Sequence, residues 1–189
     1  MAKQSGTRVI TNKVRFLYAH LLEKYKNPLS NKESYSATIL IPKDDKETLD
    51  VIAAAIKSAT TEGAAHGITG IRRTPLRDGD QDRPEDPLFA NCMFMNCSSQ
   101  YQPDIIDRYG NHVVNPDEVY SGMYGRVSLN FFAYSAAGNK GISANLGNVQ
   151  KLEDGERLSG RASARSEFSE FIEEGGNTEA NNGETELPF

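Results

Sequence analysis

The sequence has no tryptophan, only two cysteines and three histidines, and no long apolar run. No stretch approaches the roughly 20 apolar residues of a membrane-spanning helix, and the polar N-terminal segment lacks the apolar core of a signal peptide. Cys92 and Cys97 have no second Cys or His pair nearby, so they lack the ligands for a closed zinc site. We therefore expect a soluble intracellular protein with no membrane partner, whose cysteines are reduced and buried in a strand.

Residue patterns that indicate catalysis are also sparse. The sequence has no Gly-x4-Gly-Lys phosphate loop, and its histidines are scattered: His20, His66 and His112. Asp78-Gly79-Asp80-Gln81-Asp82 resembles the start of a calcium loop, but Arg83 and Phe89 stand where that loop requires Gly and Glu. The sequence thus predicts no enzyme, no metal site and no cofactor. A magnesium-dependent nuclease and a phage structural or adaptor protein are the alternatives.

Positive charge is absent from the C-terminal end of the chain. Residues 1–165 hold all 21 Lys and Arg against 19 Asp and Glu, a formal charge of +2, whereas residues 166–189 hold seven Glu and no Lys or Arg. Residues 175–185 contain no large apolar side chain, so we expect residues 166–189 to form a largely disordered acidic tail. Such a tail can bind partners or occupy an empty cationic groove. Alternatively, it only keeps the protein soluble.

The tail ends in Glu186-Leu187-Pro188-Phe189. Proline limits the entropy lost on binding, phenylalanine can fill a pocket, and the carboxylates can pair with a basic rim. We therefore expect these four residues to dock onto a partner protein.

Residues 1–165 are expected to form one mainly β domain. Alternating or β-branched and aromatic runs predict strands over residues 8–20, 35–41, 92–97, 123–134 and 142–152, with a hairpin about residues 108–111. Five or six strands and an inserted helix fit an OB-fold, a small Greek-key β-barrel.

The inserted helix begins after Asp44 or Asp45, either of which can cap it, and we expect it to stop at Gly63. Its predicted apolar face comprises Leu49, Ile52, Ala53 and Ile56. Residues 72–87 are charged and aperiodic, which predicts a long loop and a candidate flap over a ligand.

The strand over residues 123–134 has two unlike faces. One is apolar: Met123, Val127, Leu129, Phe131 and Ala133. The other carries Tyr124, Arg126, Ser128, Asn130, Phe132 and Tyr134. Rings that stack on bases, interleaved with cations that neutralise phosphates, bind single-stranded nucleic acid without sequence preference. We predict that Tyr124, Arg126, Phe132 and Tyr134 contact DNA, although strands favour aromatic residues in any case and the helix or the flap could cover these rings.

Further basic and aromatic residues could extend such a surface, although for each taken singly a solvated surface charge or a core ring is the more common role. They are Lys13, Arg15, Tyr18, Arg72, Arg73, Arg77, Tyr101, Arg108, Tyr109 and Lys140.

Several segments carry a family resemblance. The terminal Glu-Leu-Pro-Phe resembles the acidic, Pro-Phe-ended tail by which bacterial single-stranded DNA-binding proteins recruit replication and repair enzymes. The body is similar to a bacteriophage family long filed as a domain of unknown function, whose studied members are single-stranded DNA-binding proteins with an OB-fold. The segments that carry the second resemblance are Thr38-Ile39-Leu40-Ile41-Pro42-Lys43, Pro75-Leu76-Arg77-Asp78-Gly79-Asp80, Tyr120-Ser121-Gly122-Met123-Tyr124-Gly125-Arg126 and Gly138-Asn139-Lys140-Gly141-Ile142.

The resemblance implies a single-stranded DNA-binding domain over residues 1–165 and a recruiting tail over residues 166–189. It implies binding and protection of single-stranded DNA during phage DNA replication or recombination, in the cytoplasm of the infected bacterium. The implied partners are single-stranded DNA and replication or recombination proteins. The resemblance leaves open whether the protein forms a homo-oligomer.

Overall fold

The computed structural model describes residues 1–158. Its strands are β1 (Lys3–Ser5), β2 (Arg8–Ile10), β3 (Val14–Lys26), β4 (Glu33–Pro42), β5 (Arg77–Asp78), β6 (Cys92–Ser99), β7 (Ile105–Ile106), β8 (Tyr124–Ala136) and β9 (Asn139–Glu153). The helices are α1 (Lys46–Ala65) and α2 (Gly79–Asp82), with short 3-10 turns η1 (Pro87–Phe89) and η2 (Pro116–Glu118). The predicted domain boundary at residue 165, the tail and its docking peptide lie outside the described residues.

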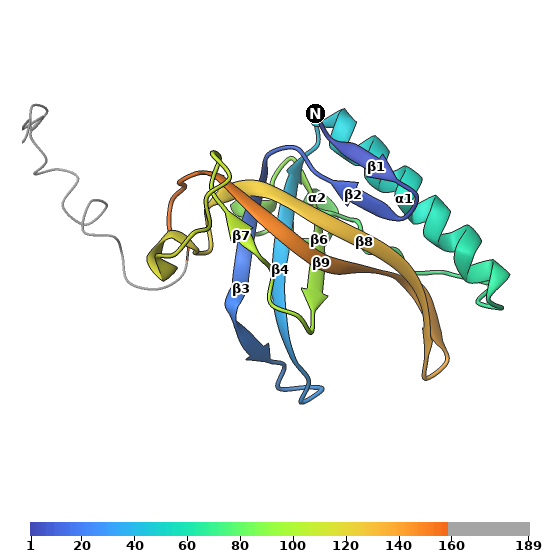
Figure 1. The fold of residues 1–189 in the computed structure, drawn as a ribbon. Coiled ribbons are helices and arrows are strands. Elements are labelled where there is room, and N and C mark those ends of the chain that lie inside the picture. The colour runs from blue at the N-terminus through green and yellow to red at the C-terminus, as the bar shows by residue number, and fades with distance from the viewer. Residues whose placement is uncertain (159–189) are drawn as a thin grey trace, which may run out of the picture. The chain divides into compact units, whose positions relative to one another are not determined.

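Five long strands form a closed ring (Figure 1). β3 pairs with β4, β4 with β6, and β8 with both β3 and β9, all antiparallel. A parallel bridge between Ser98 of β6 and Asn145 of β9 completes the ring. This connectivity is that of a five-stranded Greek-key barrel, so the predicted mainly β fold is confirmed. In chain order, the barrel strands are β3, β4, β6, β8 and β9.

Alternate residues of the barrel strands fill the interior. Ile39 of β4 and Met95 of β6 are fully buried, and Leu129 of β8 is 2% exposed. The predicted apolar face of β8 is therefore confirmed. Both cysteines lie in β6 and are free, but only Cys97 is in the barrel core, where burial raises the pKa of its thiol to about 12.

Helix α1 begins where its sequence predicts. The Asp45 carboxylate accepts a hydrogen bond from the Thr48 amide at 3.1 Å and so caps the first turn. The predicted stop at Gly63 is wrong, because α1 continues to Ala65. A Cβ on Gly63 would lie 2.4 Å from the Cβ of Ala133, so this glycine lets the helix approach β8 closely. The prediction that Ala53 is buried is also wrong, since its position in the core is taken by Ala55.

The prediction of a long loop over residues 72–87 is wrong for residues 77–82. β5 pairs with β6, and α2 follows directly. Lys43 Nζ lies 2.7 Å from a carboxylate oxygen of both Asp78 and Asp80, which fastens this segment to the end of β4. It adjoins η1, whose Phe89 packs on an apolar cluster outside the barrel with Leu17, Leu40 and Phe94. The segment is held in place by ion pairs with a residue far away in the sequence. Hydrophobic periodicity does not reveal such pairs, so the sequence pattern predicted a loop.

Among residues 1–158, no helix has both the length and the apolar composition needed to cross a membrane.

Candidate nucleic-acid interface

A groove of about 700 Å³ crosses the outer face of β3, β4 and β6 and reaches β9. It exists because the residues of β4 that alternate with its core positions are small and polar. Ser34, Ser36 and Thr38 form the floor on β4, Asn96 and Ser98 continue it on β6, and Ser143 continues it on β9. Thr38 Oγ1 donates a hydrogen bond to Asn96 Oδ1 at 2.6 Å.

Three aromatic side chains of β3 line one side of this groove: Tyr18, His20 and Tyr25. The rings of His20 and Tyr25 stack with their centroids 4.6 Å apart. The side chain of Tyr18 is 61% exposed, and its φ is +45°, in the left-handed region that bulky residues avoid. Tyr18 lies where the register between β3 and β4 shifts, so an irregularity in the strand presents this ring.

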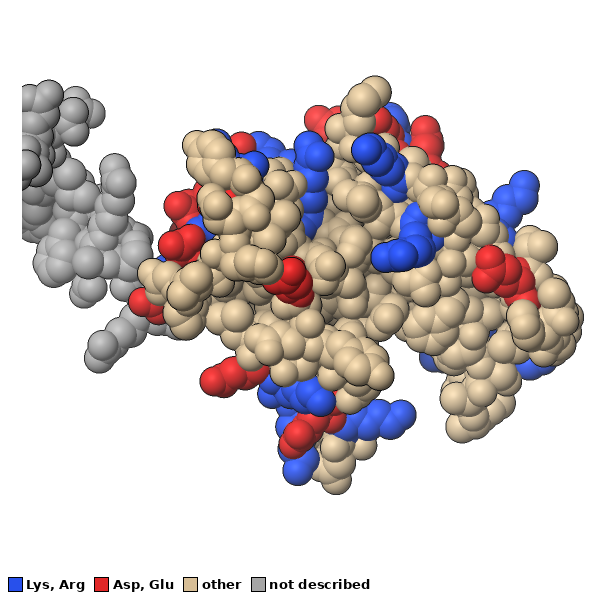
Figure 2. All heavy atoms as spheres, in the orientation of Figure 1, with Lys and Arg blue, Asp and Glu red and all other residues tan. Residues whose placement is uncertain are grey.

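The charge of the groove is favourable for an anionic chain. None of its lining residues, all within the described part of the protein, is acidic, and Arg83 contributes a guanidinium group. The β3–β4 and β8–β9 hairpins project from the barrel, and the end of β6 lies between them (Figure 1). In the space-filling view an open notch separates the two hairpins (Figure 2). An extended chain can therefore reach the floor between them.

Three predicted cations meet at the tip of the β8–β9 hairpin. Arg72, Arg73 and Lys140 line a hollow of about 540 Å³ with Gly70, Gly138 and neighbouring residues. The Ile142 amide donates to the Arg73 carbonyl at 2.8 Å, and Lys140 Nζ donates to the Thr69 carbonyl at 3.0 Å. The segment after α1 is thus fastened to the hairpin.

The four predicted DNA-contacting residues of β8 share one face but lie in three different surroundings. Tyr124 is flanked by Lys13 and Arg15, whose charged groups lie 5.7 and 5.4 Å from its ring centroid. Phe132, which is 44% exposed, and Tyr134 lie on the hairpin opposite Ser143 and Gly141.

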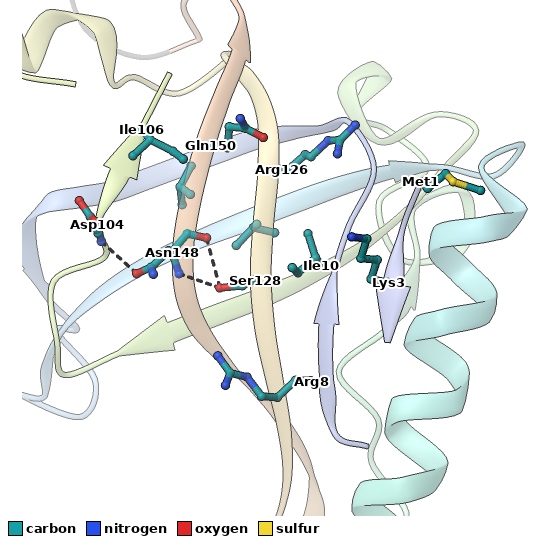
Figure 3. A pocket seen from close by; sticks show the side chains of 12 residues that line it. Met1, Lys3, Arg8, Ile10, Asp104, Ile106, Arg126, Ser128, Asn148 and Gln150 are labelled. Atoms are coloured by element: carbon teal, nitrogen blue, oxygen red, sulfur yellow. Dashed lines mark hydrogen bonds between the residues drawn. The ribbon is translucent and has the colours of Figure 1, made fainter. Parts of the chain in front are cut away.

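Arg126 lines a separate cleft on the outer face of β8 and β9 (Figure 3). Neither this residue nor the other three lines the groove itself.

Other predicted residues have neighbours that account for them structurally. Arg77 pairs with Asp82 at 2.6 Å and lies over the ring of Phe94. Arg108 donates to the carbonyl of Leu152. Tyr101 and Tyr109 are 84% and 82% exposed and lie outside the groove. Of the predicted residues, the structure brings Tyr18 into the groove and gathers Arg72, Arg73 and Lys140 at one hairpin tip.

Most residues of the groove were not predicted from the sequence: His20, Tyr25, Ser34, Ser36, Thr38, Arg83, Asn96, Ser98 and Ser143. One signal was present, because Ser34, Ser36 and Thr38 alternate with apolar residues along β4. That alternation indicates a polar outer face, but it does not show that β3 and β6 add rings and amides beside it.

Within residues 1–158, no three His, Cys, Asp or Glu side chains come close enough to share a metal ion. The acidic residues of the calcium-loop-like segment form ion pairs instead, Asp78 and Asp80 with Lys43 and Asp82 with Arg77. The ammonium group of Lys43 holds the pKa of the Asp78 and Asp80 carboxyls below their usual value.

A family model and a curated protein each match most of the chain. A family model described as the single-stranded DNA-binding protein of Enterobacter phage Enc34 matches residues 7–180. Protein p50 of Acyrthosiphon pisum secondary endosymbiont phage 1 is 29% identical over 163 residues, which cover 81% of this chain and 87% of that protein.

Two solved structures share the fold. The single-stranded DNA-binding protein from bacteriophage Enc34, in complex with single-stranded DNA, has a TM-score of 0.74 at 22% identity, over 84% of this chain and 97% of that chain. The single-stranded DNA-binding protein gp2.5 of bacteriophage T7 has a TM-score of 0.56 at 15% identity, over 95% of this chain and 100% of that chain.

Proposed function

Because the chain belongs to the family of phage single-stranded DNA-binding proteins typified by that of Enterobacter phage Enc34, we propose that it binds single-stranded DNA in the groove across β3, β4 and β6. In OB barrels, oligonucleotides bind to the face of the second and third strands and to the loops after the first and fourth strands. Here these strands are β4 and β6, and the loops are residues 27–32 and 137–138. The observation that carries the proposal is the row of rings of Tyr18, His20 and Tyr25 beside a floor that has no acidic side chain among the described residues.

Each part of the groove has a role in this binding. The rings of Tyr18, His20 and Tyr25 stack on bases, and stacking accepts every base because every base has a π-face. Arg83, together with the cations at the tip of the β8–β9 hairpin, neutralises phosphates. The hydroxyl and amide groups of the floor hydrogen-bond to phosphate and sugar oxygens, which carry no sequence information. The binding is therefore unspecific and weakens as the salt concentration rises.

In the infected bacterial cytoplasm, such binding protects single strands during phage DNA replication or recombination. The acidic tail, residues 166–189, recruits replication or recombination proteins through Glu186, Leu187, Pro188 and Phe189. The support for this role is the composition of the tail and its resemblance to bacterial tails.

The groove is tested in the full-length chain by replacing both residues of its stacked pair with alanine. His20→Ala with Tyr25→Ala should weaken binding of oligo(dT), measured by fluorescence anisotropy, by about 1–3 kcal/mol for each stacked base that is lost. Tyr101→Ala is the matched control, since that ring is 84% exposed and lies outside the groove. Equal affinities of the parent and a folded double variant would contradict the proposal, as would an equal loss in the control.

The tail is tested separately. Its seven Glu, tethered to a body of charge +2, compete with phosphates at high effective concentration. Removing residues 166–189 should therefore strengthen DNA binding, most at low salt. Removing Phe189 alone should leave DNA affinity nearly unchanged and abolish capture of replication or recombination proteins. Unchanged DNA affinity in the first variant, or unchanged capture in the second, would contradict the corresponding role.

A further inference from the structure

A second cleft, of about 460 Å³, lies on the outer face of β8 and β9 (Figure 3). Three cations line it: Lys3 of β1, Arg8 of β2 and Arg126 of β8. Figure 3 shows Arg126 toward one end and Arg8 toward the other, with Ser128 and Asn148 between them. A neighbouring hollow shares Arg8 and Ser128 and extends the cleft to Asn130 and Asn145. We call the two together the β8–β9 cleft.

The cations of this cleft are available to a ligand. The ion pairs formed within residues 1–158 involve none of Lys3, Arg8 and Arg126. Arg126 Nε is buried and has no hydrogen-bond partner within the same residues. Among the described residues, Asp104 alone brings a carboxylate to the cleft, and it lies 2.9 Å from His112 Nδ1. A buried donor without a partner is unfavourable, so the guanidinium group of Arg126 has hydrogen-bonding capacity that the described residues do not fill.

The cleft differs chemically from the groove. None of the residues 1–158 that line it is aromatic, so these residues offer bases nothing on which to stack. It offers guanidinium and ammonium groups together with the side chains of Ser128, Asn130, Asn145, Asn148 and Gln150. These groups hydrogen-bond to phosphate and sugar oxygens. Along β8, Arg126 and Asn130, the partner of Arg8, are about 13 Å apart at the usual rise per residue, so the cations are spaced along a line.

A continuous polar row joins the groove to the cleft. Pairing in the sheet sets His20 beside Ser36, Ser36 beside Ser98, and Ser98 beside Asn145. It then sets Asn145 beside Asn130, and Asn130 beside Arg8. Paired residues point to the same face of a sheet, so these side chains form one row across the outside of the barrel. The row contains no apolar or acidic residue.

From this row and the unpartnered cations, we infer that the β8–β9 cleft binds the phosphodiester backbone of the single strand that leaves the groove. This inference rests on the proposed function of the groove. It adds a second contact surface that holds phosphates without stacking bases, so the site occupied by a long strand is larger than the groove.

The acidic tail is the competing anion, and the polar row favours DNA as the ligand of the cleft, because the row joins the cleft to the groove. The last described residue, Leu158, packs beside Leu17 and Leu40, and its amide donates to the Ser121 carbonyl at 2.9 Å. The described part of the chain therefore ends beside β3 and β4, whereas the polar row leads from the groove to the cleft.

The test compares three full-length proteins: the parent, the variant Arg8→Gln with Arg126→Gln, and the control Lys46→Gln with Lys57→Gln. The control removes the same charge from exposed positions of α1 that line neither surface. Binding is measured over a series of salt concentrations with oligo(dT) of about 6 nucleotides, which fills only the groove, and of about 30 nucleotides.

We expect the Arg8→Gln, Arg126→Gln variant to bind the short oligonucleotide as the parent does, which also shows that it is folded. On the long oligonucleotide its affinity at low salt should fall several-fold. The slope of log affinity against log salt should decrease by about 1.4, since each lost phosphate contact on a single strand removes about 0.7. The control should match the parent on both oligonucleotides.

Three results would overturn the inference, and they are distinguishable. If the parent binds neither oligonucleotide, the proposed function itself is wrong. If the parent binds both and the variant keeps the parent's slope on the long one, the groove is supported but the cleft does not bind DNA. If the variant loses affinity for the short oligonucleotide, the cleft holds the acidic tail, because a released tail would compete in the groove.

Discussion

At the scale of single residues, Tyr18 combines backbone strain with exposure. A non-glycine residue held at φ +45° costs on the order of 1–3 kcal/mol, and such residues gather at functional sites. Burial does not offset that cost here, because the side chain is 61% exposed in the groove. The proposed stacking of this ring on a base would explain why the strain is retained.

Replacing Tyr18 should therefore separate stability from binding. Tyr18→Gly relieves the strain but adds chain entropy to the unfolded state, so the free energy of unfolding should stay level or rise by up to about 2 kcal/mol. Binding of oligo(dT) should weaken by about 1–3 kcal/mol. Tyr18→Phe keeps the ring and should keep the binding. Denaturant unfolding and fluorescence anisotropy measure the two quantities. A clear loss of stability in Tyr18→Gly, with no change in binding, would mean that the ring is structural.

Two positions of β8, one in the core and one on the surface, should respond differently to replacement by alanine: the first in stability and the second in DNA binding. Leu129 is 2% exposed in the barrel core, so Leu129→Ala should lower the free energy of unfolding by about 2–5 kcal/mol. Phe132 is 44% exposed beside the hairpin, so Phe132→Ala should leave the thermal midpoint nearly unchanged. If its ring stacks on a base, binding should weaken by about 1–3 kcal/mol. Unfolding of Phe132→Ala, without a separate binding defect, would reverse the assignment of the two faces.

At the scale of elements, features that depend on residues close together in the chain could be predicted from the sequence, whereas contacts between distant elements could not. Asp45 caps α1 through an amide three residues away, and such a contact is visible in the sequence. The role of Gly63 depends on Ala133, which no pattern within the helix reveals. The order in residues 77–82 depends on Lys43 in the same way.

The same limit applies to the candidate site. The sequence correctly predicted the alternation of β8, which is a property of one strand. The groove requires β3, β4 and β6 to lie side by side, and its Tyr18 is presented by a register shift that alternation cannot anticipate. Arg72 and Lys140 are 68 positions apart in the chain, so only the folded structure shows that they share a hollow.

The segment over residues 77–82 should be loosened by acid. The pKa of the Asp78 and Asp80 carboxyls is lowered in the folded state by their hydrogen bonds to Lys43. Their contribution to stability is therefore complete above their unfolded pKa of about 4 and is lost as the pH falls through the lower, folded value.

Thermal unfolding of the parent and of Asp80→Asn, followed from pH 7 to about pH 2, measures this contribution. Asp80→Asn should be the less stable protein at neutral pH, and the difference should shrink in acid. A difference in midpoint that does not change with pH would show that the ion pair does not set it.

At the scale of the whole molecule, the barrel presents different chemistry on different sides. The groove offers rings and hydroxyls, the hairpin tip and the β8–β9 cleft offer cations, and the described residues carry their charges outside the core. A net charge of −5 is therefore compatible with DNA binding, because the negative excess lies in residues 166–189 while residues 1–165 carry +2. The distribution of charge, rather than its sum, decides what the surface binds.

The most direct test of the central claim is to map where a single strand touches the full-length protein. An oligo(dT) in which some thymines are replaced by 5-iodouracil is bound and irradiated, and the crosslinked peptides are identified by mass spectrometry. Base stacking in the groove predicts crosslinks within β3, at Tyr18, His20 or Tyr25. Crosslinks confined to Tyr101 and Tyr109, which lie outside the groove, or a complex that forms with none in β3, would contradict the account.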